Sequence, residues 1–174
     1  MSIEEYASSF LEEEIRIIEN SSRMDVISEL SVFEKAIIYK YSDNGYEDLN
    51  ERLRKNKGEN MPLFAKLLDE SLSKLPDFTG FVFRGIDLSK AEFKRYQDIF
   101  DKNELLTENF FISTSRNRFI GNQFGTTRFE LFVKNGKAIE QIAKYNDEKE
   151  VVLRYNSVFV ISRVDDYLIQ LNEV

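Results

Sequence analysis

The sequence contains neither cysteine nor histidine among its 174 residues. Without cysteine the fold has no disulfide, and thiol catalysis and cysteine-bound metals are excluded. Without histidine, the Ser-His-Asp triad, Cys-His pairs and the usual zinc ligands are excluded as well. Catalysis would therefore have to use carboxylates, arginine, lysine, tyrosine or side-chain hydroxyls and amides. Glycosyl transfer and glycoside hydrolysis are among the few chemistries that need only these groups.

Proline and glycine are scarce, at two and seven residues, which leaves no room for a flexible linker or a collagen-like segment. Basic residues are outnumbered by acidic ones, 24 to 31, so the net charge is −7. This balance disfavours nonspecific binding to nucleic acid or to an anionic membrane, and we expect no nucleic-acid partner. No apolar run approaches the length of a membrane span. The first five residues, Met1 to Glu5, lack the features of a Sec-type signal peptide.

The remaining composition is that of a globular protein, with 42% hydrophobic residues, 15 phenylalanines and eight tyrosines. This is enough apolar material for a substantial core, so disorder is not expected. The length predicts a single domain over residues 1–174, mainly helical over 1–75 and mainly β over 76–174.

The first half has the periodicity of helices. Apolar residues recur at helical spacing over residues 3–18 and again over 22–38. Residues 41–45 have the composition of a turn, a short helix then continues to Arg54, and residues 55–60 form a polar loop. Pro62 suits the first turn of a further helix, which Pro76 ends.

After Pro76 the period changes to that of strands, predicted at residues 81–85, 109–115, 128–133, 150–155, 158–164 and 167–171. A turn is predicted at Asn135-Gly136, and Ser89 and Glu92 form a capping box in front of a brief helix. A helical half followed by a β-rich half indicates an α+β fold rather than a doubly wound parallel sheet.

Glu148, Lys149 and Glu150 precede the apolar run Val151-Val152-Leu153. Alternate residues of a strand point to the same face, so on an extended backbone both carboxylates would project together from a buried strand. Such a pair is either a solvated edge or a working site, and taken alone the edge is the more common case.

Two other predicted strands end in polar residues. Arg84 follows an apolar strand, where its planar guanidinium suits a phosphate or carboxylate, although a salt bridge to a structural acid is an alternative. Gly85 permits a close backbone approach or starts a loop. Ser113-Thr114-Ser115 could position a carboxylate or a sugar hydroxyl, or could satisfy local backbone groups.

In this order, Arg-Gly, Ser-Thr-Ser and Glu-x-Glu resemble the Arg-Ser-Glu signature of the mono-ADP-ribosyltransferases, in the arginine-specific branch. The spacings are 29 residues from Arg84 to Ser113 and 37 from Ser113 to Glu150. Residues 37–41 and 45–54 also look like the family's helical segment with its Asn-x-x-Leu-Arg ending. The resemblance covers residues 33–172, whereas the first 20 residues match no part of the family. Those residues would pack on the catalytic domain, or form a chaperone-binding or membrane-targeting helix.

The resemblance implies N-terminal helices packed on a β-rich two-sheet sandwich, and the transfer of ADP-ribose from NAD, the substrate, to an acceptor without a metal. Glu150 would stabilise the oxocarbenium-like sugar, as in glycoside hydrolysis. Ser113 would hold this glutamate and line the nicotinamide pocket. Arg84 would bind a phosphate or hold the site together, and Gly85 would offer its backbone to the nicotinamide amide.

Glu148 matches the residue that orients the acceptor, because an arginine with a pKa of about 13 is a poor nucleophile until a carboxylate takes its proton or pairs its charge. Tyr145 would be the exposed aromatic of a recognition turn at residues 144–147, or would pack on the sheet. Asn50 and Arg54, a helical turn apart, match positions that contact NAD, although capping or solvent is an alternative for Asn50.

The loop at residues 116–125 would cover the nicotinamide, and its Phe119 and Phe124 would belong either to that cover or to the core. We expect a monomer without a membrane span, acting in the cytoplasm on a target protein that carries an acceptor arginine. The type would be a bacterial effector, toxin or phage enzyme, secreted or delivered into a host cell without a cleavable Sec-type signal, because no translocation domain is evident.

Other functions remain open. They are NAD glycohydrolysis, transfer to a different acceptor, and a partner-binding module with a degenerate site. A glycosidase fits poorly, because its two carboxylates stand ~5–9 Å apart across a bond rather than side by side on one strand.

Overall fold

The computed structural model describes residues 1–174 and divides into two compact units. The helical unit comprises Met1–Pro76 together with Ile139–Asp147, and the β unit comprises Asp77–Ala138 together with Glu148–Val174. No helix is both long and apolar enough to cross a membrane. That the whole chain acts as one catalytic domain stays a prediction.

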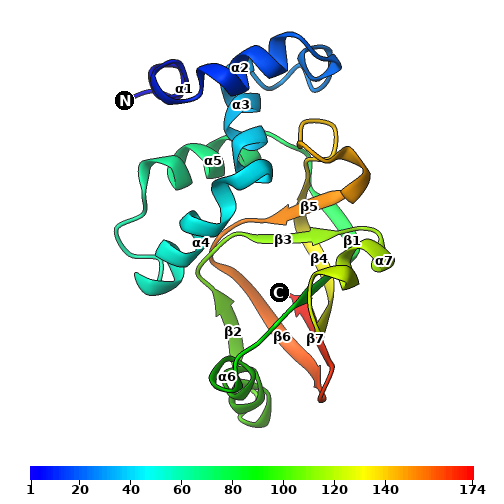
Figure 1. Cartoon of the computed structure of the whole chain (residues 1–174). Coiled ribbons are helices and arrows are strands. Elements are labelled where there is room, and N and C mark those ends of the chain that lie inside the picture. The colour runs from blue at the N-terminus through cyan, green and yellow to red at the C-terminus, as the bar shows by residue number, and fades with distance from the viewer. The chain divides into compact units, whose positions relative to one another are not determined.

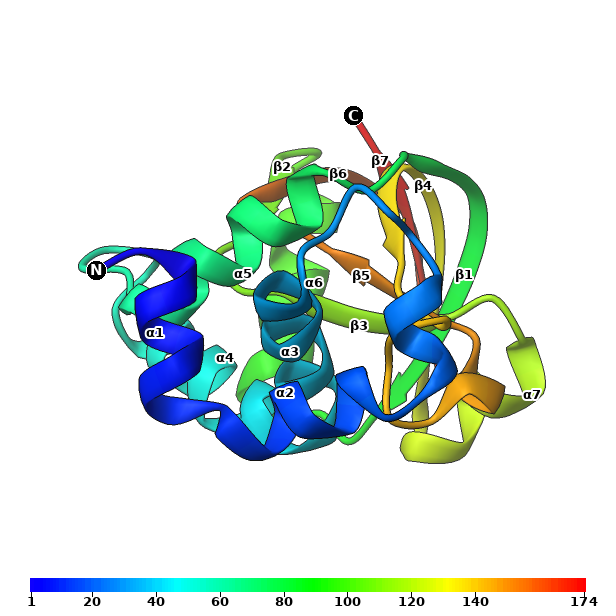
Figure 2. The same cartoon turned by 90° about the horizontal axis from the view of Figure 1, so that it is seen from above.

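The helical unit is built around α3 (Val32–Lys40), which Figure 2 shows surrounded by α1 (Ile3–Phe10), α2 (Glu12–Glu19) and α5 (Leu63–Ser73). Between α2 and α3 lies a short 3₁₀ turn, η1 (Ser22–Asp25), and α4 (Tyr46–Lys55) precedes α5. Side chains from α2 to α5 form its fully buried centre, namely Ile18, Ile37, Ile38, Leu53, Leu68 and Leu72.

Two predicted helix boundaries were wrong. The first helix is broken at Leu11, which has a non-helical backbone (φ −129°, ψ 34°). The second helix begins only after Ser31, whose hydroxyl accepts from the Glu34 N–H while the Glu34 carboxylate accepts from the Ser31 N–H. This capping box fixes the start of α3, whereas Ile27, with φ 51°, lies in a non-helical stretch before it.

The predicted turn at residues 41–45 is also wrong. Residues Tyr41–Gly45 form a single π-helical turn, η2, which joins α3 to α4. Gly45 has right-handed helical angles (φ −80°, ψ −15°) instead of the left-handed ones expected of a turn glycine. Isolated π turns inside helices are often found at functional positions.

The β unit contains seven strands and two helices. The strands are β1 (Phe78–Ile86), β2 (Leu105–Glu108), β3 (Ile112–Ser115), β4 (Thr127–Ala138), β5 (Glu150–Leu153), β6 (Ser157–Val164) and β7 (Leu168–Glu173). The helices are α6 (Lys90–Asp101) and α7 (Arg118–Gly121), followed by a short 3₁₀ turn η3 (Asn122–Phe124). The capping box predicted at Ser89 and Glu92 is confirmed and starts α6.

Hydrogen bonds join the strands in the order β1-β3-β5-β4-β7-β6-β2, and β1 also pairs with β4. Strands β1, β3, β5 and β4 therefore close on themselves, and Figure 1 shows β3 and β5 side by side at a steep angle to β6 and β7. All pairs are antiparallel except β4 with β7. The predicted α+β class is thus confirmed.

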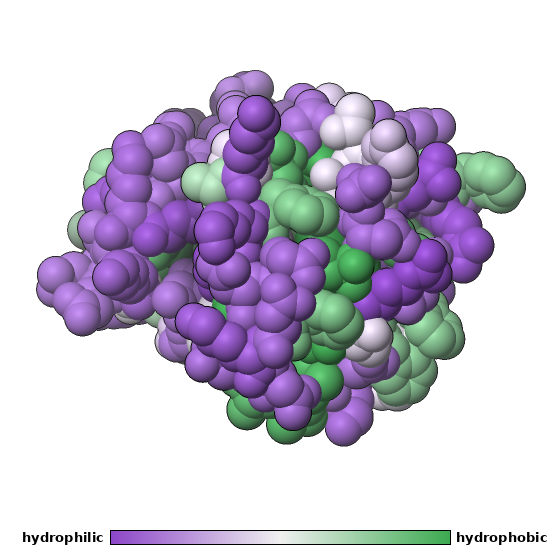
Figure 3. All heavy atoms as spheres, turned by 90° about the horizontal axis from the view of Figure 1, so that it is seen from below, coloured by the Kyte–Doolittle hydropathy of each residue, from purple (hydrophilic) through white to green (hydrophobic).

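Two details of the sheet differ from the sequence prediction. The predicted turn at Asn135-Gly136 lies within β4, where a Cβ on Gly136 would stand 2.7 Å from Val151 Cγ1, so the glycine is there for close packing. Strand β2 was not predicted. Leu105 is exposed and Leu106 is the only apolar residue of the strand in the core, so the sequence shows no alternation of apolar and polar residues there. Figure 3 shows further apolar (green) side chains exposed among polar (purple) ones.

Candidate active site

Glu150 is the first residue of β5, and the strand behind it is fully buried. Val151, Val152 and Leu153 have no exposed surface, which confirms the predicted core strand. Only 8% of Glu150 is exposed, and this burial, with a smaller contribution from the charge of Glu148, raises the pKa of its carboxyl to about 7. A carboxyl in this state is held half-ionised near neutral pH.

Ser113 lies on the neighbouring strand β3 and hydrogen-bonds the Glu150 carboxylate, which acts to lower its pKa. The register explains this contact. Ser115 is the Cα partner of Glu150 and Ser113 that of Val152, so Ser113 and Glu150 are diagonal neighbours on one face of the β3–β5 pair. The structure therefore brings together Ser113, Glu148 and Glu150.

The geometry of the carboxylate pair differs from the prediction. Glu148 does not lie on the strand but ends a 3₁₀ turn, η4 (Asn146–Glu148), and Lys149 has a left-handed backbone (φ 51°). The two carboxylates thus leave the backbone from different local structures: Glu150 is buried and Glu148 is partly exposed. The pair is not a solvated edge, since one member lies in the core.

Thr114 and Ser115 hold this bend in place, a role that sequence reasoning considered for the triplet but did not assign. The Ser115 hydroxyl donates to the Glu148 carbonyl (2.6 Å), and the Arg116 N–H donates to the Lys149 carbonyl (3.1 Å). The Thr114 hydroxyl donates to the Val151 carbonyl (2.6 Å). Two of the three hydroxyls therefore satisfy backbone groups around Glu150, and the third contacts its carboxylate.

Arg84 lies near the end of β1 and is the Cα partner of Phe129 on β4. Phe129 packs against the ring of Tyr96 from α6, with ring centres 5.3 Å apart. Tyr96 in turn donates a 2.8 Å hydrogen bond to Glu108, which is 2% exposed. Burial and then Glu108 raise the pKa of Tyr96, whereas the charge of Arg84 acts in the opposite direction. Arg84 therefore lies within electrostatic reach of a buried tyrosine–glutamate pair.

Gly85 follows Arg84 on β1, so a side chain at this position would project from the opposite face of the strand. A Cβ on Gly85 would stand 3.1 Å from both N and O of Gly125, and a Cβ on Gly125 would stand 2.3 Å from the Ile86 carbonyl carbon. The segment after β3 is thus packed directly onto β1 through two glycines. The Asp87 carboxylate fixes its end by accepting from the N–H and the hydroxyl of Thr126, both at 2.9 Å.

This segment, residues 116–125, was predicted to cover the nicotinamide. Its Phe119 and Phe124 are 81% and 61% exposed, so neither belongs to the core. Asn122 lies between them, and its Oδ1 atom is buried without a hydrogen-bond partner. A buried acceptor of this kind fits a ligand that carries an N–H group, as the nicotinamide carboxamide of NAD does.

The other candidate residues lie in the helical unit. Asn50, on α4, is 6% exposed and its Nδ2 donates to the Tyr41 hydroxyl at 3.4 Å, so it neither caps a helix nor faces solvent. Arg54 is exposed one turn further along α4. Tyr145 is 48% exposed, and the Lys144 ammonium lies 5.5 Å from its ring centre. Its exposure agrees with the prediction of an exposed aromatic residue in the turn.

The fold is similar to that of solved ADP-ribosyltransferases. Exoenzyme S from Pseudomonas aeruginosa, solved with human 14-3-3 protein beta and carba-NAD, superposes with a TM-score of 0.77 at 19% identity, over 99% of this chain and 87% of that one. The ADP-ribosyltransferase Vis from Vibrio splendidus, solved with agmatine, gives 0.70 at 21% identity, over 94% and 85%.

The sequence model of the ADP-ribosyltransferase exoenzyme family matches residues 18–173, so the chain belongs to this family. A curated relative from Mycobacterium avium (strain 104), with the provisional name NAD(+)–arginine ADP-ribosyltransferase Mav, is 29% identical over 136 residues. The match covers 75% of this chain but only 16% of that much longer protein.

Proposed function

We propose that the protein transfers ADP-ribose from NAD to the side chain of an arginine on a target protein and releases nicotinamide. Membership of the ADP-ribosyltransferase exoenzyme family supports the use of NAD. The observation that carries the proposal is the unequal carboxylate pair, in which Glu150 is buried beside Ser113 and Glu148 is partly exposed.

Glu150 is assigned to NAD. When the nicotinamide–ribose bond breaks, positive charge develops on the ribose, and a carboxylate in a low-dielectric site stabilises that charge more strongly than water does. The same positive charge favours ionisation of Glu150, whose pKa is about 7 without the substrate. Ser113 keeps the carboxylate in one orientation and helps it to ionise.

The rest of the NAD site is assigned as follows. The segment at residues 116–125, with buried Asn122 Oδ1, covers the nicotinamide against the backbone of Gly85. Arg84 orders β1 through the Tyr96–Glu108 cluster or meets a phosphate of NAD, and exposed Arg54 is a second phosphate ligand. Asn50 acts at most indirectly, because its side chain is buried against Tyr41.

Glu148 is assigned to the acceptor. A guanidinium is fully protonated in water and becomes nucleophilic only when a base takes its proton or pairs its charge. A partly exposed carboxylate one residue from the NAD-directed glutamate can do both. The complex of Vis with agmatine, a small guanidinium compound, supports such an acceptor, and so does the name of the mycobacterial relative.

The experiment measures two products, ADP-ribosylated agmatine and free nicotinamide, with NAD as the donor. Glu148→Gln should remove labelling of agmatine while nicotinamide release into water continues, and Glu150→Gln should remove both. Glu13→Gln is the matched control, because it makes the same chemical change at an exposed position on α2 and should leave transfer unchanged.

If Glu148→Gln still labels agmatine, the assignment of Glu148 is wrong. If the wild type releases nicotinamide but labels neither agmatine nor a protein in a lysate, the activity is NAD glycohydrolysis instead. Action as a monomer inside a host cell belongs to the same proposal, and the description of Vis as a toxin supports it.

A further inference from the structure

The segment Ile139–Asp147 belongs to the helical unit, although the residues on either side of it belong to the β unit. It makes few backbone hydrogen bonds of its own: the Ile142 and Ala143 N–H groups both donate to the Ile139 carbonyl, at 2.9 and 2.8 Å. The carbonyls of residues 142–144 therefore need partners from elsewhere, because Ile142 and Ala143 are fully buried.

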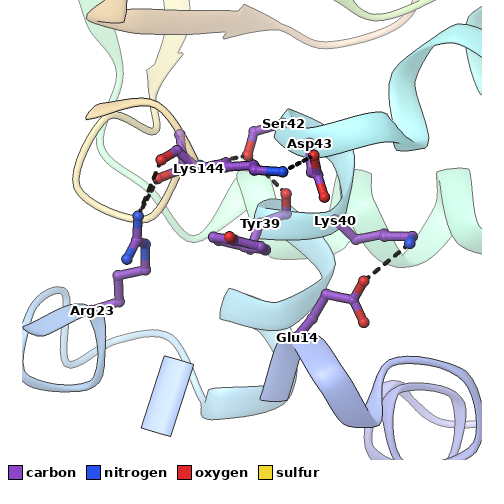
Figure 4. A network of polar contacts seen from close by, with 8 residues as sticks. Glu14, Arg23, Tyr39, Lys40, Ser42, Asp43 and Lys144 are labelled. Atoms are coloured by element: carbon purple, nitrogen blue, oxygen red, sulfur yellow. Dashed lines mark hydrogen bonds and ion pairs between the residues drawn. The ribbon is translucent and has the colours of Figure 1, made fainter. Parts of the chain in front are cut away.

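A single side chain supplies these partners. Arg23, in η1, donates from Nε to the Ile142 carbonyl (2.8 Å) and from Nη2 to the carbonyls of Ala143 (2.9 Å) and Lys144 (3.3 Å). The same Nη2 lies 3.2 Å from Asn146 Oδ1. Figure 4 shows the guanidinium pointing at this turn, with the Tyr39 ring beside it. Only arginine offers several N–H donors in one rigid plane, so the contact is specific to this residue type.

Arg23 is itself held in position. Its guanidinium carbon lies 5.2 Å from the centre of the Tyr39 ring, a cation–π contact with a largely buried aromatic side chain. Its backbone N–H donates to the Ser21 hydroxyl, which caps η1. The donors therefore meet the turn in a fixed geometry.

The π turn η2 provides a second attachment. The Ser42 hydroxyl accepts from the Lys144 N–H (2.9 Å) and donates to the Tyr39 carbonyl (2.8 Å), and Asp43 accepts from the Lys144 ammonium (2.6 Å). Lys144 is thus held through its N–H, its carbonyl and its side chain. On the other side of Tyr145, Asn146 is held by Arg23 and by its own Nδ2, which donates to the Glu140 carbonyl (2.8 Å).

We infer that Arg23 is a positioning residue for the acceptor: it fixes the turn that presents exposed Tyr145 and leads through Asp147 into Glu148. The two neighbours of Tyr145 are both bound by one guanidinium, and Glu148 is two residues beyond Asn146. Loosening this clamp displaces Tyr145 and loosens the turn that leads to Glu148, whereas the Glu148 carbonyl stays bound by Ser115 and Glu150 keeps its hydrogen bond to Ser113 on β3. The expected effect on agmatine kinetics rests on the proposed transfer to arginine. The hydrogen bonds by which Arg23 holds the turn do not depend on that proposal.

The test compares Arg23→Met and Arg23→Lys with wild type, and uses Arg16→Met as the control. Arg16 is an exposed arginine on α2, seven residues before Arg23. Misplacing a substrate-orienting group by about 1 Å can cost up to about 100-fold, so we expect Arg23→Met to lower kcat/KM for agmatine by about 10- to 100-fold, mainly through KM.

The KM for NAD and the release of nicotinamide into water should stay within about twofold of wild type, because neither uses the acceptor turn. The kcat/KM of Arg23→Lys for agmatine should lie between the values of wild type and Arg23→Met, since a lysine ammonium can replace some of the hydrogen bonds that the guanidinium donates. Arg16→Met should match wild type. Equal losses of agmatine transfer and of nicotinamide release in Arg23→Met would overturn the inference, and so would an unchanged KM for agmatine.

Amide hydrogen exchange tests the clamp independently of activity. In Arg23→Met, exchange at Ala143 and Lys144 should accelerate while exchange in β3 and β5 stays unchanged. If wild type releases nicotinamide but never labels agmatine, the proposed function fails and this measurement alone decides the clamp, which unchanged exchange would refute. Should Arg23→Met not fold, Ser42→Ala removes one hydrogen bond of the second attachment, leaves the Asp43–Lys144 ion pair in place, and must show the same separation between KM for agmatine and nicotinamide release in smaller measure.

Discussion

The buried carboxyl of Glu150 makes stability depend on pH in a way that one substitution removes. Its pKa is about 7 in the folded protein against a usual value of 4.5. Below pH 4.5 the carboxyl is protonated whether the chain is folded or not. Between pH 4.5 and 7 the folded protein holds a proton that the unfolded chain has released, so the free energy of unfolding falls as the pH rises. Above pH 7 the decrease is complete.

The size of the effect follows from the two pKa values. One pKa unit corresponds to about 1.4 kcal/mol, so the difference between 4.5 and about 7 corresponds to about 3 kcal/mol. This is a large fraction of the 5–15 kcal/mol by which domains are typically stable. Glutamine at this position stays neutral at every pH and can still accept from the Ser113 hydroxyl, so Glu150→Gln should not show this fall.

The assay is urea unfolding of wild type and Glu150→Gln at several pH values between 4.5 and 8. The free energy of unfolding of the variant minus that of wild type should grow by about 3 kcal/mol over this range. Glu13→Gln makes the same chemical change on the exposed side of α2 and should keep the fall that Glu150 causes in wild type. A constant difference for Glu150→Gln would refute the raised pKa, and a difference that shrinks with rising pH would reverse its sign.

Three further results follow from the same site. Nicotinamide release should increase as the pH rises through about 7, because the role proposed for Glu150 needs its ionised form; a rate that falls over this interval would contradict that role. Ser113→Ala should move the midpoint of that pH–rate profile upward, since the hydroxyl lowers the pKa of Glu150, and an unchanged midpoint would count against the contact. Gly125→Ala should lower the free energy of unfolding by about 1–3 kcal/mol in chemical denaturation, because the added Cβ would stand 2.3 Å from the backbone of Ile86. An unchanged free energy of unfolding would mean that residues 116–125 can move away from β1 at no cost.

The sequence predicts those parts of the structure that follow from local pattern. The apolar run Val151-Val152-Leu153 is fully buried, as expected of a core strand, and the capping box at Ser89 starts α6. The order of Arg84, Ser113 and Glu150 leads to the correct family. Each of these signals lies within a few residues or in a fixed order along the chain.

The parts that could not be predicted depend on contacts between distant residues. Lys149 adopts a left-handed backbone because the hydroxyl of Ser115 and the N–H of Arg116 bind the carbonyls on either side of it, 33 residues away. A lysine carries no signal for that conformation, so the extended Glu-x-Glu strand was the natural prediction. Likewise, Arg23 lies about 120 residues from the carbonyls that it binds, and no periodicity connects them.

The bend at Lys149 changes how the two glutamates must be understood. On a regular strand Glu148 and Glu150 would share one face and one environment, and their roles could be exchanged. The left-handed residue separates them, so one carboxylate is buried, which raises its pKa to about 7, and the other stays partly exposed. In its ionised form a buried carboxylate suits the positive charge that develops on a sugar, whereas a partly exposed carboxylate suits a cationic acceptor arriving from solvent. The backbone of one lysine, held by Ser115 and Arg116, therefore gives the two glutamates the different environments on which their proposed roles depend.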